Sequence, residues 1–298
     1  MSSALTLRAP AKVNLSLEIV SRRLDGFHDI DTVMTTIDLA DEVRLSAHAG
    51  LEVRLVGPRA KGIDATDDLA GRAAKVLAEA AGRSPDVSIE VTKRIPSPGG
   101  LGGGSSDAGA VLRGLNELWG LNWTVERLRA VAAEVGSDVP FFLECGTARC
   151  TGRGEVVDPL RDMKTLRMLV LVPPVDAGHG KTARRYAALT HRDFSNGHRT
   201  WRLAQRVARG APPPTNDLVN AFEGVIERTD AELVAHYSSY RGAGAPQLHL
   251  CGSGPAVYLL VTEGARVHEL RRELEAVGAL VFEARTLPRE QALAIQRA

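Results

Sequence analysis

The chain has 298 residues, of which 44% are apolar and 24% charged, a composition typical of a globular protein with room for about two domains. Lys and Arg (37) nearly balance Asp and Glu (36), so no overall field favours a nucleic acid or a membrane surface as partner. The N-terminus lacks the apolar segment of a signal peptide, and the longest apolar run, LRMLVLVPPV, is too short to span a bilayer. We therefore expect a cytoplasmic protein without nucleic-acid or membrane partners.

The first half of the chain alternates predicted strands and helices. Residues 13–20 alternate apolar and polar side chains, which predicts a half-buried strand, and residues 42–57 predict two strands that meet at Ala49 and Gly50. Residues 67–82 are rich in Ala and Leu, begin with acidic residues and end at Gly82, as a helix does. A strand over 87–93 leads to a glycine-rich loop, and helices follow over 105–120 and about 124–135.

The second half begins with a predicted strand over 166–172. A Pro-rich loop over 210–217 precedes a helix that starts near Leu218. Strand-like segments over 247–254 and 256–261, a helix over 265–278 and a last strand over 279–286 complete the chain. Because strands and helices interleave irregularly, the sequence predicts an α+β fold rather than a doubly wound sheet. We place a domain boundary near residue 160, which gives domains of residues 1–160 and 161–298.

The glycine-rich loop is the first functional signal. Five of the six residues from 99 to 104 are glycine, and the segment lies between a predicted strand and a predicted helix. Backbone N–H groups at such a helix start suit a phosphate, and the hydroxyls of Ser105 and Ser106 can reach a phosphate or a magnesium shell. A flexible surface loop is the alternative. No lysine follows the glycines as in a Walker A loop, and no G-x-G-x-x-G pattern fits.

Other strings resemble known motifs only imperfectly. VDAGHGKT ends in Gly180, Lys181 and Thr182, but Val175 stands where a P-loop requires its first glycine. HRDFSNGH resembles the protein-kinase catalytic loop, yet His198 stands at the metal-binding asparagine, and DFG and V-A-I-K strings are absent from the sequence. We discard the protein-kinase interpretation and regard a P-loop centred on Lys181 as remote. Four arginines at helical spacing over 199–209 predict a solvated helix face rather than an RNA-binding one.

Metal-binding patterns are missing from the sequence. Cys145, Cys150 and Cys251 form neither a CxxC pair nor a zinc spacing, so we interpret them as reduced thiols. No acidic cluster indicates an all-protein cage for a divalent cation.

Four strings in order, PAKVNLSL, DGFH, GLGGGSSDA and GSDVPF, together with LHLCGSGPAVY near the end, resemble the GHMP kinase superfamily of galactose, homoserine, mevalonate and phosphomevalonate kinases. Within it the match is closest to the kinases of 4-diphosphocytidyl-2-C-methyl-D-erythritol, an intermediate of the non-mevalonate isoprenoid pathway. The resemblance runs from about residue 5 to residue 285 and is densest in the first 160. It implies an N-terminal domain similar to ribosomal protein S5 domain 2, a C-terminal α+β sandwich and an active site between them.

The resemblance implies ATP as the phosphoryl donor, with Mg²⁺ delivered with the nucleotide, and a small cytidyl diphosphate as the acceptor, phosphorylated on its 2-hydroxyl. Asp68 stands where the family often has Asn, so it is either an adenine contact or only a helix N-cap. The glycine loop then wraps the triphosphate, and the implied ATP-binding residues are Lys93, Pro96, Ser97, Pro98, Gly99, Gly100, Leu101, Gly102, Gly103, Gly104, Ser105 and Ser106.

Two residues match the family's catalytic positions. Asp138 in GSDVPF corresponds to the catalytic aspartate, a general base toward the 2-hydroxyl; without the resemblance, an aspartate that satisfies a turn is equally good. Lys12 in PAKVNL corresponds to the catalytic lysine, which would keep Asp138 ionised, whereas alone it would be a solvated strand-end lysine. Asn14 shares the face of Lys12 and can bind the substrate hydroxyl. Buried Lys and Asn on a strand are costly unless they are paired.

The resemblance also implies a cytosine site. Phe27 can stack on the base in place of the family's usual tyrosine, and His28 can hydrogen-bond the edge of the base. The segment KTARRY suggests Tyr186 as the second aromatic residue and Thr182 as a further contact. The structural alternatives are a core phenylalanine and a turn histidine.

Two other functions compete with this one. One is the activity of another GHMP small-molecule kinase, although DGFH and GGGSSDA argue against it. The other is a catalytically silent GHMP-fold binding protein, which would be expected to have lost Lys12, Asn14 and Asp138. We expect a monomer or a weak homodimer.

Overall fold

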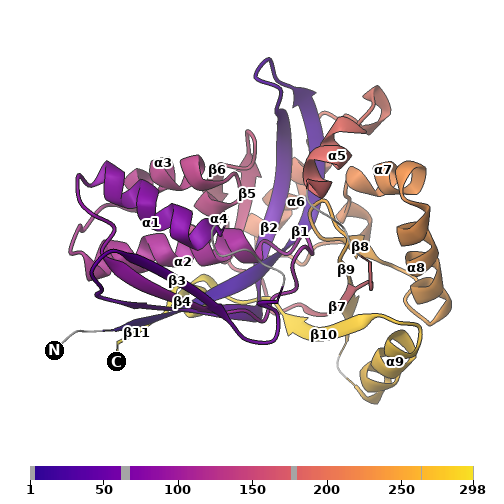
Figure 1. Ribbon diagram of the computed structural model, residues 1–298. Coiled ribbons are helices and arrows are strands. Elements are labelled where there is room, and N and C mark those ends of the chain that lie inside the picture. The colour runs from indigo at the N-terminus through magenta and orange to yellow at the C-terminus, as the bar shows by residue number, and fades with distance from the viewer. Residues whose placement is uncertain (1–3, 62–67, 176–179, 263, 298) are drawn as a thin grey trace.

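A computed structural model describes residues 4–61, 68–175, 180–262 and 264–297 (Figure 1). Asp67 and the middle of the VDAGHGKT string lie outside the described residues. The strands form two sheets. The first has the order β11-β1-β2-β4-β3, with β5 paired to β2 and β6 to β5, and contains β1 (Leu5–Arg22), β2 (His28–Ser46), β3 (Leu51–Val56), β4 (Val87–Thr92), β5 (Thr147–Thr151), β6 (Val156–Pro159) and β11 (Ile295–Arg297). The second has the order β10-β7-β9-β8 and contains β7 (Arg167–Val172), β8 (His249–Leu250), β9 (Val257–Val261) and β10 (Leu280–Arg285).

Helices of the first half pack together over the first sheet (Figure 1). They are α1 (Leu69–Ala80), α2 (Gly103–Leu118), α3 (Val125–Val135) and α4 (Val139–Glu144). The second half contributes α5 (Lys181–Ala187), α6 (His198–Ala208), α7 (Phe222–Thr229), α8 (Ala231–Gly242), α9 (Ala265–Ala276) and α10 (Arg289–Leu293), with short 3₁₀ turns at His191–Asp193 and Thr215–Asp217. This mixture of mainly antiparallel sheets and helices confirms the α+β prediction.

Strand β1 is buried on both faces, so the prediction of a half-buried strand was wrong. The polar side chains of Asn14, Ser16 and Glu18 are as buried as their apolar neighbours. The reason is tertiary: helices α2 and α6 both contact β1, and the backbone N–H of Leu17 donates to the carbonyl of Val219, in a segment far along the chain. Each buried polar group therefore needs a partner, and Glu18 accepts hydrogen bonds from Ser195 and Thr200.

The two strands predicted over 42–57 exist, but β4 lies between them. β4 pairs antiparallel with β2 and parallel with β3. A parallel pair needs a crossover connection, and α1 provides it. Ala73, Ala74 and Leu77 of α1 are fully buried, which explains the alanine-rich pattern of this helix.

The sequence predicted that the strand over 279–286 is the last one. The structure has a further strand, β11, after β10. After β10 the chain returns to the first sheet, where α10 packs and β11 pairs antiparallel with residues 5–7 of β1, so that both termini lie at one edge (Figure 1). A strand of three residues, Ile295–Arg297, carries too little pattern to be predicted from the sequence. The predicted boundary near residue 160 falls between β6 and β7, while residues 287–297 belong in space to the first sheet.

Two predicted elements of the second half are shorter than expected. The helix predicted from Leu218 begins at Phe222, where the side chain of Asn220 accepts from the backbone N–H of Phe222. The strand expected over 247–254 is limited to His249–Leu250, because the glycines that follow form a turn.

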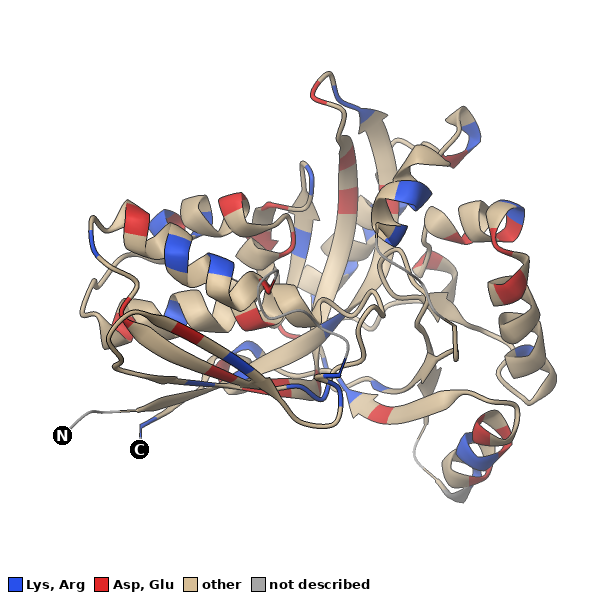
Figure 2. Cartoon of the chain, viewed as in Figure 1, with Lys and Arg blue, Asp and Glu red and all other residues tan. Residues whose placement is uncertain are grey.

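Charged side chains of both signs occur in both halves of the molecule (Figure 2). On α6, Arg202 pairs with Asp217 and Arg206 bonds the carbonyl of Pro212, as expected for a solvated helix face. No helix within the described ranges is long and apolar enough to cross a membrane.

Candidate active site

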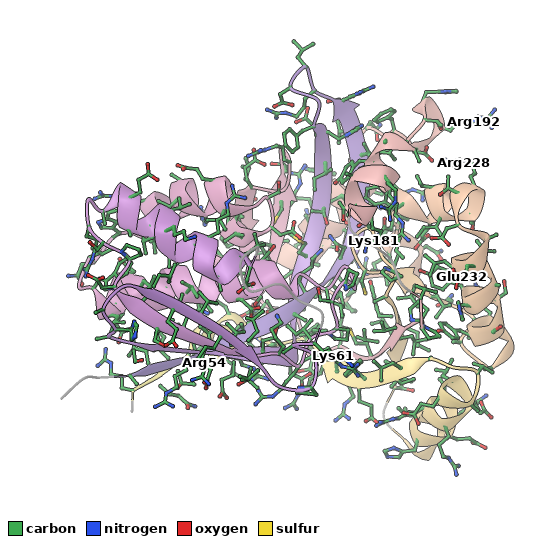
Figure 3. The ribbon with its side chains drawn as sticks, in the orientation of Figure 1. Arg54, Lys61, Lys181, Arg192, Arg228 and Glu232 are labelled. Atoms are coloured by element: carbon green, nitrogen blue, oxygen red, sulfur yellow. The ribbon has the colours of Figure 1, made fainter. Side chains whose placement is uncertain are left out.

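A cavity of about 1550 Å³ brings together most of the residues that the sequence singled out. The glycine loop over 96–105 forms part of its lining, together with residues of β1, the tip of the β1–β2 hairpin, helix α5 and the turn at 252–253. Lys61 and Lys181, both labelled in Figure 3, also line it. The lining is thus drawn from both halves of the chain.

Lys12 and Asp138 meet at this cavity. Lys12 Nζ lies 3.4 Å from Asp138 Oδ2, with 4% of the lysine side chain and 33% of the aspartate side chain exposed. The register of β1 shifts just before Lys12, and its backbone N–H donates to the carbonyl of Leu101 in the glycine loop. Asp138 immediately precedes α4. A buried cation therefore lies beside a carboxylate that remains open to a ligand.

Asn14 holds this lysine in place. Its Oδ1 accepts from Lys12 Nζ at 2.8 Å and from the backbone N–H of Gly252 at 2.9 Å, and its Nδ2 donates to Thr32 Oγ1 at 2.8 Å. The polar pair expected on one face of the strand is thus satisfied. Asn14 also lines the cavity, where its predicted contact with the substrate hydroxyl stays a prediction.

The glycine loop packs against the turn at 251–254. Gly100 has φ +80°, and a Cβ there would overlap the carbonyl oxygen of Cys251, so only glycine fits. Gly102 has φ +73° and ends the loop, because α2 begins at Gly103 rather than at Ser105 as predicted. Gly103 and Gly104 adopt helical conformations, which low helix propensity had argued against. The start of a 16-residue helix therefore lies at the cavity.

Lys93 and Ser106 do not appear in the cavity lining, although the resemblance implied that both contact ATP. Lys93 is buried, and its Nζ donates to Asp41 and, at 2.5 Å, to Asp107. Burial lowers the pKa of Lys93, but the two carboxylates outweigh it and raise this pKa overall. Burial also raises the pKa of Asp107 well above its usual range, against the opposing effect of Lys93. The Oγ of Ser106 is buried without a hydrogen-bond partner.

A group of aromatic rings lies at another part of the cavity. The ring centroids of His28 and Tyr186 are 5.2 Å apart, and those of His28 and Phe194 are 6.1 Å apart. Phe27 is 50% exposed, with the guanidinium carbon of Arg153 at 4.9 Å from its ring centroid. Burial and the charge of Arg22 lower the pKa of His28, so its imidazole is neutral near pH 7 and can donate and accept hydrogen bonds.

The aromatic group consists of Phe27, His28, Tyr186 and Phe194, of which the sequence predicted the first three. It missed Phe194 and the neighbouring Arg153. Arg153 lies in the string TGRGE, which follows the matched GSDVPF motif, so its position there was a usable signal. Phe194 lies in the string set aside as a false protein-kinase motif, and no pattern marks it. Thr182, predicted from a loose match, lies in the lining with its Oγ1 3.1 Å from Ser253 Oγ.

Comparison with known proteins identifies the family. Residues 68–146 match the GHMP kinases N terminal domain. A 4-diphosphocytidyl-2-C-methyl-D-erythritol kinase of Dehalococcoides mccartyi is 36% identical over 283 residues, which cover 95% of this chain and 98% of the relative. The chain belongs to the 4-diphosphocytidyl-2-C-methyl-D-erythritol kinase family of GHMP kinases. The resemblance inferred from the four sequence strings is confirmed.

Solved structures agree with membership in this kinase family. A crystal structure of 4-(cytidine 5'-diphospho)-2C-methyl-D-erythritol kinase superposes with a TM-score of 0.76 at 33% identity, covering 95% of this chain and 99% of the other. A homoserine kinase from Cytophaga hutchinsonii superposes with a TM-score of 0.68 at 16% identity, covering 99% and 97%. The second likeness shows the common GHMP fold alone.

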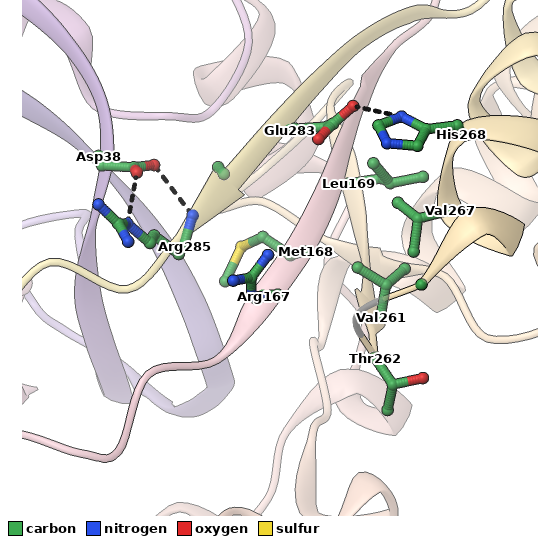
Figure 4. A pocket seen from close by; sticks show the side chains of 12 residues that line it. Asp38, Arg167, Met168, Leu169, Val261, Thr262, Val267, His268, Glu283 and Arg285 are labelled. Atoms are coloured by element: carbon green, nitrogen blue, oxygen red, sulfur yellow. Dashed lines mark hydrogen bonds and ion pairs between the residues drawn. The ribbon is translucent and has the colours of Figure 1, made fainter.

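A second hollow in this GHMP kinase, of about 450 Å³, lies between β7, β9, β10 and α9 (Figure 4). Its charged groups already have partners. Asp38 accepts from the backbone N–H and the Nε of Arg285, and Glu283 lies 3.8 Å from His268 Nδ1. Because its charges are already paired, this hollow has fewer groups that could bind a phosphate than the larger cavity has. The larger cavity is therefore the candidate active site.

Proposed function

We propose that this protein transfers the γ-phosphoryl group of ATP to the 2-hydroxyl of 4-diphosphocytidyl-2-C-methyl-D-erythritol, giving the 2-phosphate and ADP, in the non-mevalonate isoprenoid pathway. The observation that carries the proposal is the pair Lys12–Asp138, which opens on a cavity lined by the glycine loop and by an aromatic group. The 36% identity to a kinase of this substrate supports the choice of acceptor.

Asp138 is the proposed general base. Its carboxylate is open to the cavity and accepts the proton of the 2-hydroxyl as the oxygen attacks phosphorus. The ammonium of Lys12 lies 3.4 Å from this carboxylate and stabilises the negative charge that develops in the transition state. Asn14 accepts a hydrogen bond from Lys12 and is itself held by Thr32, so the ammonium is already oriented when the substrate binds.

The glycine loop is the proposed cradle for the triphosphate. Its residues 96–105 line the cavity, and Gly100 and Gly102 allow the backbone to approach a phosphate closely. The hydroxyls of Ser105, in the lining, and Ser106, buried without a partner, are oxygen ligands of the kind that Mg²⁺ prefers. Bound with ATP, Mg²⁺ would neutralise the charge of the β- and γ-phosphates. No cluster of three or more acidic, His or Cys side chains that could hold a metal by itself occurs within the described residues.

The aromatic group is the proposed cytosine site. The half-exposed ring of Phe27 can stack on the base, and the neutral imidazole of His28 can hydrogen-bond its edge. Tyr186 packs beside His28 and Thr182 lies one helical turn earlier on α5. We place residues 1–160 in one domain and 161–298 in the other, whose last segment, 287–297, returns to the first sheet. The site lies between them, in a cytoplasmic monomer or weak homodimer.

Phosphorus NMR tests the proposal directly. Purified protein is incubated with ATP, Mg²⁺ and 4-diphosphocytidyl-2-C-methyl-D-erythritol, and we expect a new phosphomonoester resonance together with ADP. Turnover of mevalonate, homoserine or a sugar instead would assign another GHMP activity. ATP binding without turnover of any acceptor would assign a silent binding protein.

A further inference from the structure

Lys181 is a buried lysine for which the catalytic scheme has no use. Its side chain lies on α5, lines the cavity and is 8% exposed, and its Nζ donates to the carbonyl of Gly254. Over the described ranges, none of the ion pairs includes Lys181. Burial, together with the positive charges of Arg185, Lys12 and Arg184, lowers its pKa to about 7. A buried ammonium among other cations is costly unless an anion neutralises it.

The neighbouring cations already have carboxylate partners. Lys12 lies 3.4 Å from Asp138, and Arg185 lies 3.3 Å from Asp230. Of these three cations, Lys181 is the one whose charge no carboxylate of the described chain offsets. An anionic ligand in the cavity would therefore stabilise its protonated form.

The position of Lys181 in the cavity indicates which part of a bound ligand it can contact. The turn that accepts its hydrogen bond touches the reaction centre, because a Cβ on Gly252 would lie 3.2 Å from Lys12 Nζ. Tyr186 follows on the same helix about 7.5 Å along the axis, beside His28. Lys181 thus lies between the reaction centre and the aromatic group. The paired hydroxyls of Thr182 and Ser253 line the same stretch of the cavity.

We propose that Lys181, with the hydroxyls of Thr182 and Ser253, forms an anion subsite that takes the diphosphate of the acceptor substrate. The inference rests on the proposed function, because a cytidyl diphosphate that reaches from the aromatic group to Asp138 carries its diphosphate between the two ends. The triphosphate of ATP is the other polyanion available, but the glycine loop supplies separate donors for it.

Protonation of Lys181 gives the subsite a signature. The groups that face this ammonium are Arg184 and Arg185 from α5, Lys12 from β1 and Cys251 from the turn. A bound diphosphate raises the pKa of Lys181, so binding takes up a proton at pH 7 to 8. Since the protonated form binds the anion, affinity is highest below pH 7 and falls as the pH rises above that value.

Calorimetric titration of the full-length protein with cytidine diphosphate (CDP) tests the subsite. For Lys181→Met we expect the Kd for CDP to rise about tenfold or more, as for loss of a charge-assisted hydrogen bond. The Kd for a non-hydrolysable ATP analogue should stay unchanged. Titrations in two buffers of different ionisation enthalpy should show proton uptake by the parent protein and its loss in the variant. Lys164→Met, which removes an exposed lysine outside the cavity, is the matched control and should behave as the parent does.

The outcomes separate the alternatives. An unchanged Kd for CDP in Lys181→Met, or binding of CDP without proton uptake by the parent protein, would overturn the subsite; the second readout needs no variant to fold. A higher Kd for the ATP analogue with an unchanged Kd for CDP would also overturn the subsite, and would assign Lys181 to the phosphates of ATP. If the parent binds CDP through Lys181 but does not phosphorylate the proposed acceptor, the proposed function fails while the subsite stands.

Discussion

Two buried lysines of this protein each meet aspartates, and the two clusters differ in their access to a ligand. Lys12 lies 3.4 Å from Asp138, whose side chain is 33% exposed at the cavity. Lys93 meets Asp41 and Asp107, whose side chains are both 0% exposed. A carboxylate can exchange a proton with a substrate only if the substrate can reach it, so the open cluster suits catalysis. The sealed cluster can act only through the structure that it holds.

The sealed cluster joins three segments around the glycine loop. Asp41 lies on β2, Lys93 directly follows β4, and Asp107 lies in the first turns of α2. Asp41 also accepts from the backbone N–H of Ile95 at 2.8 Å. The cluster thereby anchors both ends of the loop that lines the cavity. We infer that Lys93 supports the loop, whereas the family resemblance implied a direct contact with ATP.

Replacement of the open carboxylate should have the largest effect. We expect Asp138→Asn to lower kcat by about 10² to 10⁴, because the general base is lost. Its free energy of unfolding should fall by only about 1–2 kcal/mol, because the buried ammonium of Lys12 loses its carboxylate partner but the replaced side chain is partly exposed. Steady-state kinetics, thermal unfolding and ATP binding measure the three quantities. Turnover near that of the parent protein would remove Asp138 as the base.

Replacement of the sealed lysine should act on stability instead. We expect Lys93→Met to lower the free energy of unfolding by about 3–5 kcal/mol, because it leaves two buried carboxyl groups without their cation. Lys75→Met, at an exposed position on α1, is the control and should stay within about 0.5 kcal/mol. Urea unfolding measures both. Unchanged stability with much weaker ATP binding would contradict loop support and return Lys93 to the nucleotide.

Two glycines with nearly equal φ angles test how tightly the loop is packed. Gly50 has φ +82° with nothing within 4 Å of a Cβ, so Gly50→Ala should cost only the left-handed conformation, about 1 kcal/mol. Gly100 has φ +80°, but a Cβ there would overlap the carbonyl of Cys251. Gly100→Ala should therefore lower the free energy of unfolding by about 1–3 kcal/mol more than Gly50→Ala does. It should also raise the KM for ATP. If urea unfolding shows the same loss of stability for both variants, the glycine loop can shift to accommodate the added methyl group.

Replacement of Phe27, the half-exposed ring of the aromatic group, should have the smallest effect. Phe27 is 50% exposed, so Phe27→Ala should change the free energy of unfolding by less than about 0.5 kcal/mol. Loss of stacking, worth about 1–3 kcal/mol, should raise the KM for the cytidyl substrate about tenfold. The KM for ATP is the internal control and should not move. An unchanged KM for the cytidyl substrate would place the base elsewhere.

The sequence by itself determined the α+β class, most element positions and the family, because these depend on local information. Alternation and helical periodicity follow from the geometry of single strands and helices. The strings around Lys12, the glycine loop and Asp138 carry their chemistry in residue type and spacing, and the cavity brings these segments together.

The tertiary structure alone decided which polar groups face the ligand. In the sequence, Lys12 directly precedes one predicted strand and Lys93 ends another. Only packing opens the first on the cavity and seals the second between Asp41 and Asp107. Burial of both faces of β1, the return of β11 and the uncompensated charge of Lys181 likewise depend on segments far apart in the chain. Burial and Coulomb interactions are properties of neighbours in space, and a single sequence lists neighbours only along the chain.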